Sequence, residues 1–167
     1  MDQGIHMLDL IRYFCVEFDE IKSFISNDYW NHDVEDNAYA IMRNKKGQHA
    51  IIQSSATQWQ HKFRLEITLS EGYIVLSGLL TGSKSYGEET LVIGLRSQTE
   101  TGNHREETVR YLSDPSWKDE IDEFADCVIN DKKILEGNSS DSYETMKFVY
   151  RIYKADTVWA NKYKIQS

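Results

Sequence analysis

The sequence predicts an α+β domain in which an open-faced, largely antiparallel sheet is covered on one face by helices. Three observations predict this class: an amphipathic helix pattern at the start, a central run of short alternating segments joined by tight turns, and two helix patterns at the end. Strands that alternate apolar and polar residues bury one face only, and helices supply its cover. With 167 residues, 40% of them hydrophobic, the chain is expected to form one domain over residues 1–167.

The first helix is predicted from the opening fifteen residues. Its apolar residues recur at steps of three and four, which places them on one face, toward a core. These residues are Met7, Leu10, Ile11, Phe14 and Cys15. We expect the helix to end near residues 17–19.

A second line of residues on the same helix carries candidate chemistry. It consists of Asp2, His6, Asp9 and Tyr13, at steps of four, three and four, so neighbouring side chains lie within reach of one another. A carboxylate one turn from an imidazole favours the imidazolium and fixes which ring nitrogen carries the proton. The alternative is a helix that opens with Asp2 at its positive end and carries an ordinary solvated His6. The spacing alone leaves both interpretations open.

Alternating apolar and polar residues predict the strands of the sheet. They are expected at residues 20–27, 37–43, 49–56, 62–69, 73–77, 90–95 and 107–112. The second and third are joined by a hairpin turn at residues 44–47, where Gly47 supplies the positive φ that such a turn requires. Residues 28–36 and the glycine-rich stretch 78–89 are expected to be loops.

Two helices are expected at the end of the chain. The first begins at Asp114, interpreted as an N-cap, with Pro115 at the first helical position. The second begins at Asp141, whose spacing to Glu144 is that of a capping box, and extends to about Asn161. Its inner stripe is predicted to be Tyr143, Met146, Val149, Tyr150 and Tyr153.

Composition excludes several classes of partner. A formal net charge of −8 argues against binding to nucleic acid or anionic membranes, since phosphate contacts need clustered Lys and Arg. No apolar run reaches the roughly eighteen residues of a membrane span.

The cysteines Cys15 and Cys127 fall on the apolar sides of predicted helices, which favours buried reduced thiols and a cytoplasmic location. No Cys/His spacing typical of a metal site occurs.

The motifs in their order resemble the C-terminal domain of the Gfo/Idh/MocA oxidoreductases, the group that contains glucose-fructose oxidoreductase and inositol dehydrogenase. The segment from Asp2 to Asp9 is similar to the family signature Asp-x-Gly-x-His-x-x-Asp. Residues 34–47 and 64–72 resemble two of its sheet hairpins, and residues 117–155 resemble its two closing helices. The resemblance therefore covers about 150 residues in the family's order.

The resemblance implies the C-terminal half of a two-domain enzyme that oxidises or reduces a CH–OH group of a sugar, cyclitol or nucleotide-sugar with NAD or NADP. It implies that His6 is the catalytic acid/base, taking the hydroxyl proton as hydride leaves for the nicotinamide. Asp2 is then expected to bind a substrate hydroxyl and to polarise His6. Asp9 is the third substrate-binding candidate, and it either orients the site or satisfies a neighbouring backbone group.

The sequence departs from the whole family pattern in three places, one of which is the absence of the strand expected just before the signature. It has no Gly-x-Gly-x-x-Gly fingerprint for a dinucleotide, and it lacks the family's Glu-Lys-Pro segment, whose lysine supports proton transfer. The resemblance thus implies that this chain contains no cofactor-binding residues and is inactive without an N-terminal Rossmann domain. The other expected partners are a sugar-like small molecule and, across the open sheet face, a second copy of the chain. Two alternatives stay open: a non-catalytic dimerisation module and a carbohydrate-binding module.

Overall fold

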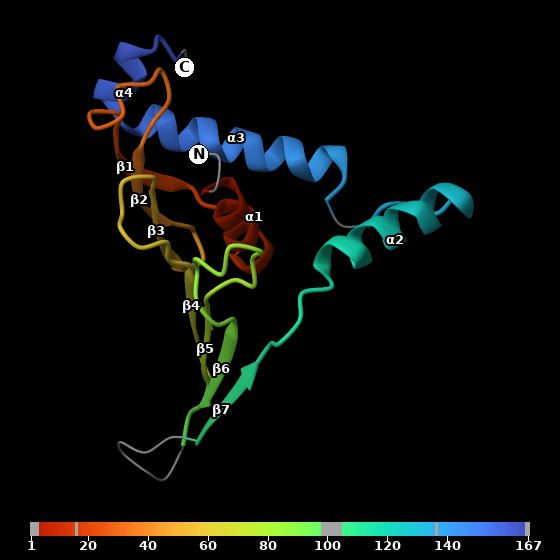
Figure 1. The fold of residues 1–167 in the computed structure, drawn as a ribbon. Coiled ribbons are helices and arrows are strands. Elements are labelled where there is room, and N and C mark those ends of the chain that lie inside the picture. The colour runs from red at the N-terminus through yellow and green to blue at the C-terminus, as the bar shows by residue number, and fades with distance from the viewer. Residues whose placement is uncertain (1–3, 16, 98–104, 136, 166–167) are drawn as a thin grey trace. The chain divides into compact units, whose positions relative to one another are not determined.

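The computed structural model describes residues 4–15, 17–97, 105–135 and 137–165 (Figure 1). In chain order the elements are α1 (Gly4–Cys15), β1 (Glu20–Ser26), β2 (Asn37–Arg43), β3 (His49–Ser55), β4 (Arg64–Leu69), β5 (Gly72–Ser77), β6 (Thr90–Leu95), β7 (Arg105–Arg110), α2 (Ser116–Ile129), α3 (Ser139–Ala155) and α4 (Thr157–Lys162). They divide into two compact units, residues 1–58 with 134–167, and residues 59–133. The expectation of one domain over residues 1–167 stays a prediction.

The first unit contains the antiparallel sheet β1-β2-β3. In its central strand Ala38, Ala40 and Met42 are buried, and the residues between them face outward. The turn between β2 and β3 is closed by a hydrogen bond of 3.0 Å from the Gly47 amide to the Asn44 carbonyl, with Gly47 at a φ of +82°. The three strands and their turn confirm the prediction from the alternating pattern.

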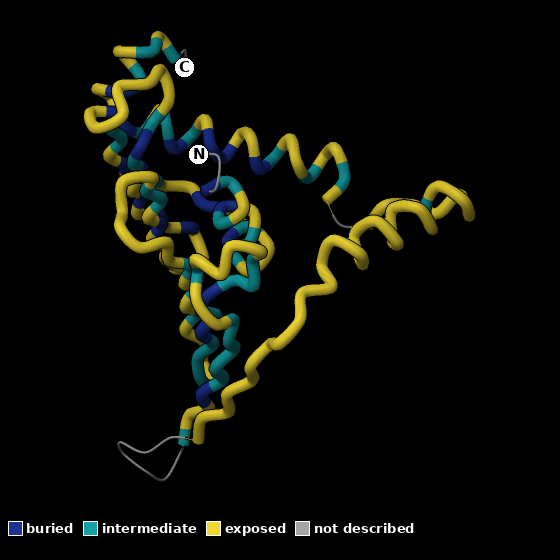
Figure 2. The backbone as a smooth tube through the Cα atoms, in the orientation of Figure 1, coloured by how far each residue is buried: buried dark blue, intermediate teal, exposed yellow. Residues whose placement is uncertain are grey.

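Helices α1 and α3 cover one face of this sheet, as the pattern predicted (Figure 1). Between the two helices and the sheet lies a core in which Leu8 and Ile152 are fully buried. In this core the rings of Phe18 and Phe148 stack with their centres 6.0 Å apart. Figure 2 shows the buried positions gathered where these helices meet the strands. The α+β class and the antiparallel pairing are confirmed, with the strands divided into two hydrogen-bonded sheets.

The outer edge of β1 is closed by side chains and helices instead of another strand. One carboxylate oxygen of Asp156 accepts a hydrogen bond of 2.7 Å from the Ile25 amide, and the other caps α4 at Val158 and Trp159. Ser23 donates a hydrogen bond of 2.6 Å to the Ile152 carbonyl. These contacts satisfy polar groups that an open strand edge leaves exposed to another chain.

Two predicted helix faces were wrong in part. On α1 the buried residues are Gly4, Leu8 and Ile11, while Phe14 of the predicted stripe is exposed. On α3 the buried residues are Thr145, Phe148, Val149 and Ile152. Of its predicted stripe Tyr143, Met146 and Tyr150 are exposed.

The predicted boundaries of the last helix also need correction. The N-cap of α3 is Asn138, whose side chain accepts hydrogen bonds from the amides of Ser140 and Asp141, so Asp141 lies inside the first turn. The helix ends at Ala155, because Asp156 leaves the helical conformation and caps the separate helix α4.

The second unit contains the antiparallel sheet β4-β5-β6-β7. Helix α2 forms in the predicted region, but its predicted start is wrong by one residue: Pro115 is the N-cap and Ser116 the first helical residue. The Asp114 carboxylate accepts a hydrogen bond of 3.0 Å from the Ser116 amide. No α2 residue is buried, and all of its residues except the half-buried Cys127 are exposed (Figure 2).

A close approach in this sheet involves Gly94. It pairs with Tyr73 on one side and with Glu106 on the other, and the Tyr73 hydroxyl donates a hydrogen bond to Glu106 across it. A Cβ atom at position 94 would lie 2.3 Å from the Tyr73 ring. The ring therefore occupies the space that a side chain at this position needs.

We expect Gly94→Val to lower the free energy of unfolding by about 1–3 kcal/mol, because the Tyr73 ring must move and give up its contact with the strand. The matched control is Gly82→Ala, where a Cβ has open space. Urea denaturation of both variants measures the difference. Equal stabilities for the two variants would contradict the described packing of Tyr73.

Asp36 orders the loop between β1 and β2. Its buried carboxylate accepts hydrogen bonds from the amides of Tyr29 and Trp30, at 2.8 and 3.2 Å, and from the Asn37 side chain at 2.9 Å. Burial alone would raise the pKa of Asp36, but these hydrogen bonds outweigh it and the pKa is lowered. The charged carboxylate therefore stabilises the folded loop.

We expect Asp36→Asn to lower the free energy of unfolding by about 1–2 kcal/mol at neutral pH. The pKa of Asp36 is lower in the folded state than in the unfolded state. The Asp36 charge therefore makes its full contribution to the free energy of unfolding above the unfolded pKa of about 3.9, and this contribution disappears as the pH falls through the pKa of the folded state. Urea denaturation from neutral to acidic pH should show the gap between wild type and variant narrowing at low pH. Asp28→Asn, on the exposed part of the same loop, should show no such gap.

Candidate functional site

Helix α1 carries the predicted site residues that the structure describes. His6 and Asp9 are exposed, on the side of the helix away from the buried residues Leu8 and Ile11. Asp2 lies outside the described residues. His6 therefore lies on an accessible surface, and its role as an acid/base stays a prediction.

Asp9 is held by the helix packed beside α1. Its Oδ1 accepts a hydrogen bond of 2.7 Å from the hydroxyl of Thr145, a buried residue of α3. The same oxygen lies 3.8 Å from Nη1 of Arg12, one turn along α1. The partner of Asp9 here is a side-chain hydroxyl, and a substrate contact for Asp9 stays a prediction.

Arg12 connects α1 to the start of α3. Its Nη1 donates to the Thr145 hydroxyl at 2.6 Å and to Oδ1 of Asp141 at 3.1 Å, and its Nε donates to Oε1 of Glu17 at 3.3 Å. Burial alone would lower the pKa of Arg12, but the hydrogen bonds to Asp141 and Glu17 outweigh it and the pKa is raised. The Arg12 guanidinium therefore stays charged. It lies within 4 Å of three carboxylates, those of Asp9, Glu17 and Asp141.

This polar network sets the position of α1 and hence of His6. The contacts Asp9–Thr145 and Arg12–Asp141 show that α1 and α3 run antiparallel, because a higher number on one helix meets a lower number on the other. The sequence analysis missed this role for Arg12, Asp141 and Thr145. Arg12 could have been found from its i, i+3 spacing to Asp9, whereas Thr145 lies 136 residues away and gave no local signal.

The structure shows no arrangement suited to a metal ion within residues 4–15, 17–97, 105–135 and 137–165: no group of three or more His, Cys, Asp or Glu side chains is close enough to hold one. Among the helices described, none is both long and apolar enough to cross a membrane. Cys15 and Cys127 are free thiols, and burial raises the pKa of Cys15.

Comparison with known proteins points to one family. Residues 1–75 match the GFO/IDH/MocA C-terminal domain. No curated protein matches the chain. The solved structures that share its fold include UDP-N-acetylglucosamine 3-dehydrogenase GnnA from Acidithiobacillus ferrooxidans, with a TM-score of 0.75 and 18% identity over 99% of this chain and 48% of that protein.

Two further dehydrogenases share the fold. Levoglucosan dehydrogenase in complex with NADH and L-sorbose has a TM-score of 0.69 and 17% identity, covering 96% of this chain and 48% of its own. The WlbA dehydrogenase from Bordetella pertussis, in complex with NADH and UDP-GlcNAcA, has a TM-score of 0.65 and 13% identity, covering 93% and 41%. This chain spans less than half the length of each of these proteins. Residues 1–75 are thus similar to the GFO/IDH/MocA C-terminal domain, and the chain as a whole shares its fold with parts of these three dehydrogenases.

Proposed function

We propose that this chain is the substrate-binding half of an NAD(P)-dependent oxidoreductase that acts on a CH–OH group of a sugar, cyclitol or nucleotide-sugar. The observation that carries the proposal is the exposed His6 on a helix that matches the C-terminal domain family. The fold likeness to dehydrogenases for UDP-N-acetylglucosamine and levoglucosan supports the substrate class. The proposed location is the cytoplasm.

In this proposal His6 is the acid/base. Its imidazole takes the proton of the substrate hydroxyl as the carbinol carbon is oxidised, and returns it in the reverse direction. Asp2 binds a substrate hydroxyl and polarises His6, and Asp9 is the third substrate-binding candidate. The network around Arg12 keeps α1 in position, which matters because a small misplacement of an acid/base sharply reduces its effect.

The described residues do not fit a nicotinamide cofactor. Their strands pair antiparallel in both sheets, whereas a dinucleotide site needs a parallel βαβ unit with a glycine-rich turn before the helix. We therefore place NAD or NADP on a separate N-terminal Rossmann domain, and we expect this chain alone to be inactive.

An assay of full-length protein with NAD or NADP and a panel of sugars, inositols and nucleotide-sugars tests the proposal. We expect reduced cofactor to accumulate with at least one substrate and none with the 167-residue chain alone. Binding of a sugar with no redox turnover under any condition would replace the proposal with a carbohydrate-binding function.

An assembly role is favoured by the open face of the first sheet. Four apolar side chains form a continuous patch on the face opposite the helices, because Phe24 pairs with Tyr39 and Ile41 pairs with Ile51 in the register. Their exposed fractions are 77% for Phe24, 75% for Ile51, 59% for Ile41 and 43% for Tyr39. An exposed apolar patch of this kind marks an interface, and we propose that a second copy of the chain covers it.

We expect Ile41→Glu to weaken self-association by about 100-fold, because a charge replaces an apolar side chain at the centre of the patch. The matched control is Val158→Glu on α4, a residue of similar exposure away from the patch. Analytical ultracentrifugation at micromolar concentrations measures both variants. A wild-type chain that stays monomeric under these conditions would contradict the assembly role.

A further inference from the structure

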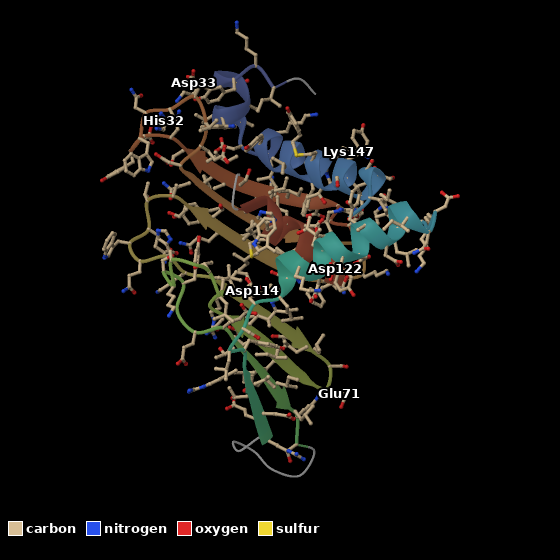
Figure 3. The ribbon with its side chains drawn as sticks, turned by 45° about the vertical axis from the view of Figure 1, so that its right-hand side comes forward. His32, Asp33, Glu71, Asp114, Asp122 and Lys147 are labelled. Carbon is tan, nitrogen blue, oxygen red and sulfur yellow. The ribbon has the colours of Figure 1, made fainter. Side chains whose placement is uncertain are left out.

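The first unit contains a pocket of about 450 Å³ that the proposed reaction does not use. It lies between the loop that precedes β2 and the helices α3 and α4. Its lining residues are Asp33, Val34, Glu35, Tyr150, Tyr153, Trp159, Tyr163, Lys164 and Ile165. Figure 3 labels Asp33 on this loop, beside the C-terminal helices.

Four aromatic rings supply most of the apolar lining, and neighbouring rings are inclined to one another. Trp159 lies 4.4 Å from Tyr163 and 6.1 Å from Tyr153, each at an interplanar angle of 43°. Tyr150 lies 6.2 Å from Tyr153 at 76°. Rings inclined in this way present faces in several directions around one volume, and ring faces carry the negative end of the aromatic quadrupole.

The hydroxyl groups of two of these rings are already engaged. Tyr153 donates a hydrogen bond of 2.9 Å to Oε2 of Glu35, and the Tyr163 hydroxyl accepts one of 2.7 Å from the Asn27 side chain. Burial, with the nearby Tyr150, raises the pKa of Tyr153 to about 12, so its hydroxyl stays protonated. The Tyr153 hydroxyl therefore has no proton left to donate to a ligand, whereas the Tyr163 hydroxyl keeps its own.

The lining of the pocket carries more negative than positive groups. It contains two carboxylates, Asp33 and Glu35, and one ammonium, Lys164, while a second ammonium, that of Lys162, lies beside two of the rings without lining the pocket. The chain itself also shows that two of the rings attract an ammonium, because Nζ of Lys162 lies 5.9 Å from the centre of Trp159 and 5.4 Å from that of Tyr163. A phosphate or other anion would instead meet the two carboxylates.

From the ring arrangement and the two carboxylates of the lining, we propose that this pocket binds an organic ammonium group. The faces of Tyr150, Tyr153 and Trp159 contact the alkyl groups around the nitrogen, and the carboxylates of Asp33 and Glu35 balance its charge. The lining of this pocket does not include His6. A failure of this proposal would therefore not affect the proposed oxidoreductase function, and the reverse also holds.

An NMR titration of the 167-residue chain with choline chloride tests the proposal. We expect the Trp159 indole signal to shift with saturation. The neutral isostere 3,3-dimethylbutanol should bind about tenfold more weakly, since it fills the same volume without the charge. Equal binding of the isostere, a shift with glucose in place of choline, or no shift with choline would each overturn the proposal.

Variants of lining residues other than the buried Trp159 test where the ligand binds. The double variant Asp33→Asn, Glu35→Gln should weaken choline binding by about tenfold, and Tyr150→Ala, at a half-exposed position, should weaken it severalfold. Asp28→Asn, a carboxylate of the same loop that does not line the pocket, should leave binding unchanged. Unchanged binding in both the double variant and Tyr150→Ala would overturn the proposal.

Discussion

Replacing His6 by alanine in a full-length enzyme that contains this chain is expected to lower kcat by about 10²–10⁴-fold and to leave the affinity for NAD(P) unchanged. The expected factor is the usual contribution of a positioned general acid or base. The affinity should not change because we place the cofactor on another domain. Steady-state kinetics measure kcat, and fluorescence titration measures cofactor binding.

The matched control for this variant is His32→Ala, at an exposed histidine on the loop between β1 and β2. Its kcat should equal that of wild type. Turnover retained by the His6 variant would remove His6 from the mechanism. A parallel loss in both variants would indicate a general effect on folding, which circular dichroism detects.

Replacing Arg12 by alanine is expected to lower the free energy of unfolding by about 2–3 kcal/mol. The Arg12 side chain is 12% exposed and connects Asp141 and Thr145 on α3 to α1. Without it, the carboxylates of Asp9 and Asp141 lose their counter-charge. Removing one partner of a fully buried pair costs about 3–5 kcal/mol, and the partial exposure of these carboxylates reduces that figure.

Urea denaturation of the chain measures this loss. The control is Arg43→Ala, whose ion pair with Glu20 at 2.5 Å is more than half exposed on both sides. Such surface pairs contribute about 0–1 kcal/mol. Equal losses in the two variants would contradict the role of Arg12 in fastening α1 to α3.

The strands were predictable from local pattern, whereas the faces of the helices were not. In β2 and β3 one alternation of apolar and polar residues, with Gly47 at the turn, determines both pairing and face. On α3 the tyrosines suggested an apolar stripe, but a tyrosine ring can lie half exposed with its polar tip in water. Thr145 is buried instead because its hydroxyl is satisfied by Asp9.

The candidate site shows the same division between local and long-range information. The steps of four and three residues placed His6 and Asp9 on one line along α1, and local periodicity was sufficient for that. The break between α3 and α4 depends on Asp156, whose carboxylate reaches the Ile25 amide 131 residues away. Contacts of this range leave no periodic trace in the sequence, so the partners of Asp9 could not be predicted. The cap that Asp156 forms on α4, two and three residues on, is by contrast a local signal that the sequence analysis missed.

The central claim is that His6 exchanges the proton of the reacting substrate hydroxyl. A crystal structure of the full-length protein with nicotinamide cofactor and substrate tests it most directly. We predict an imidazole nitrogen of His6 within hydrogen-bond distance, about 2.6–3.2 Å, of the hydroxyl oxygen on the carbon that faces the nicotinamide. A different acid or base at that oxygen, with His6 outside hydrogen-bond reach, would contradict the claim.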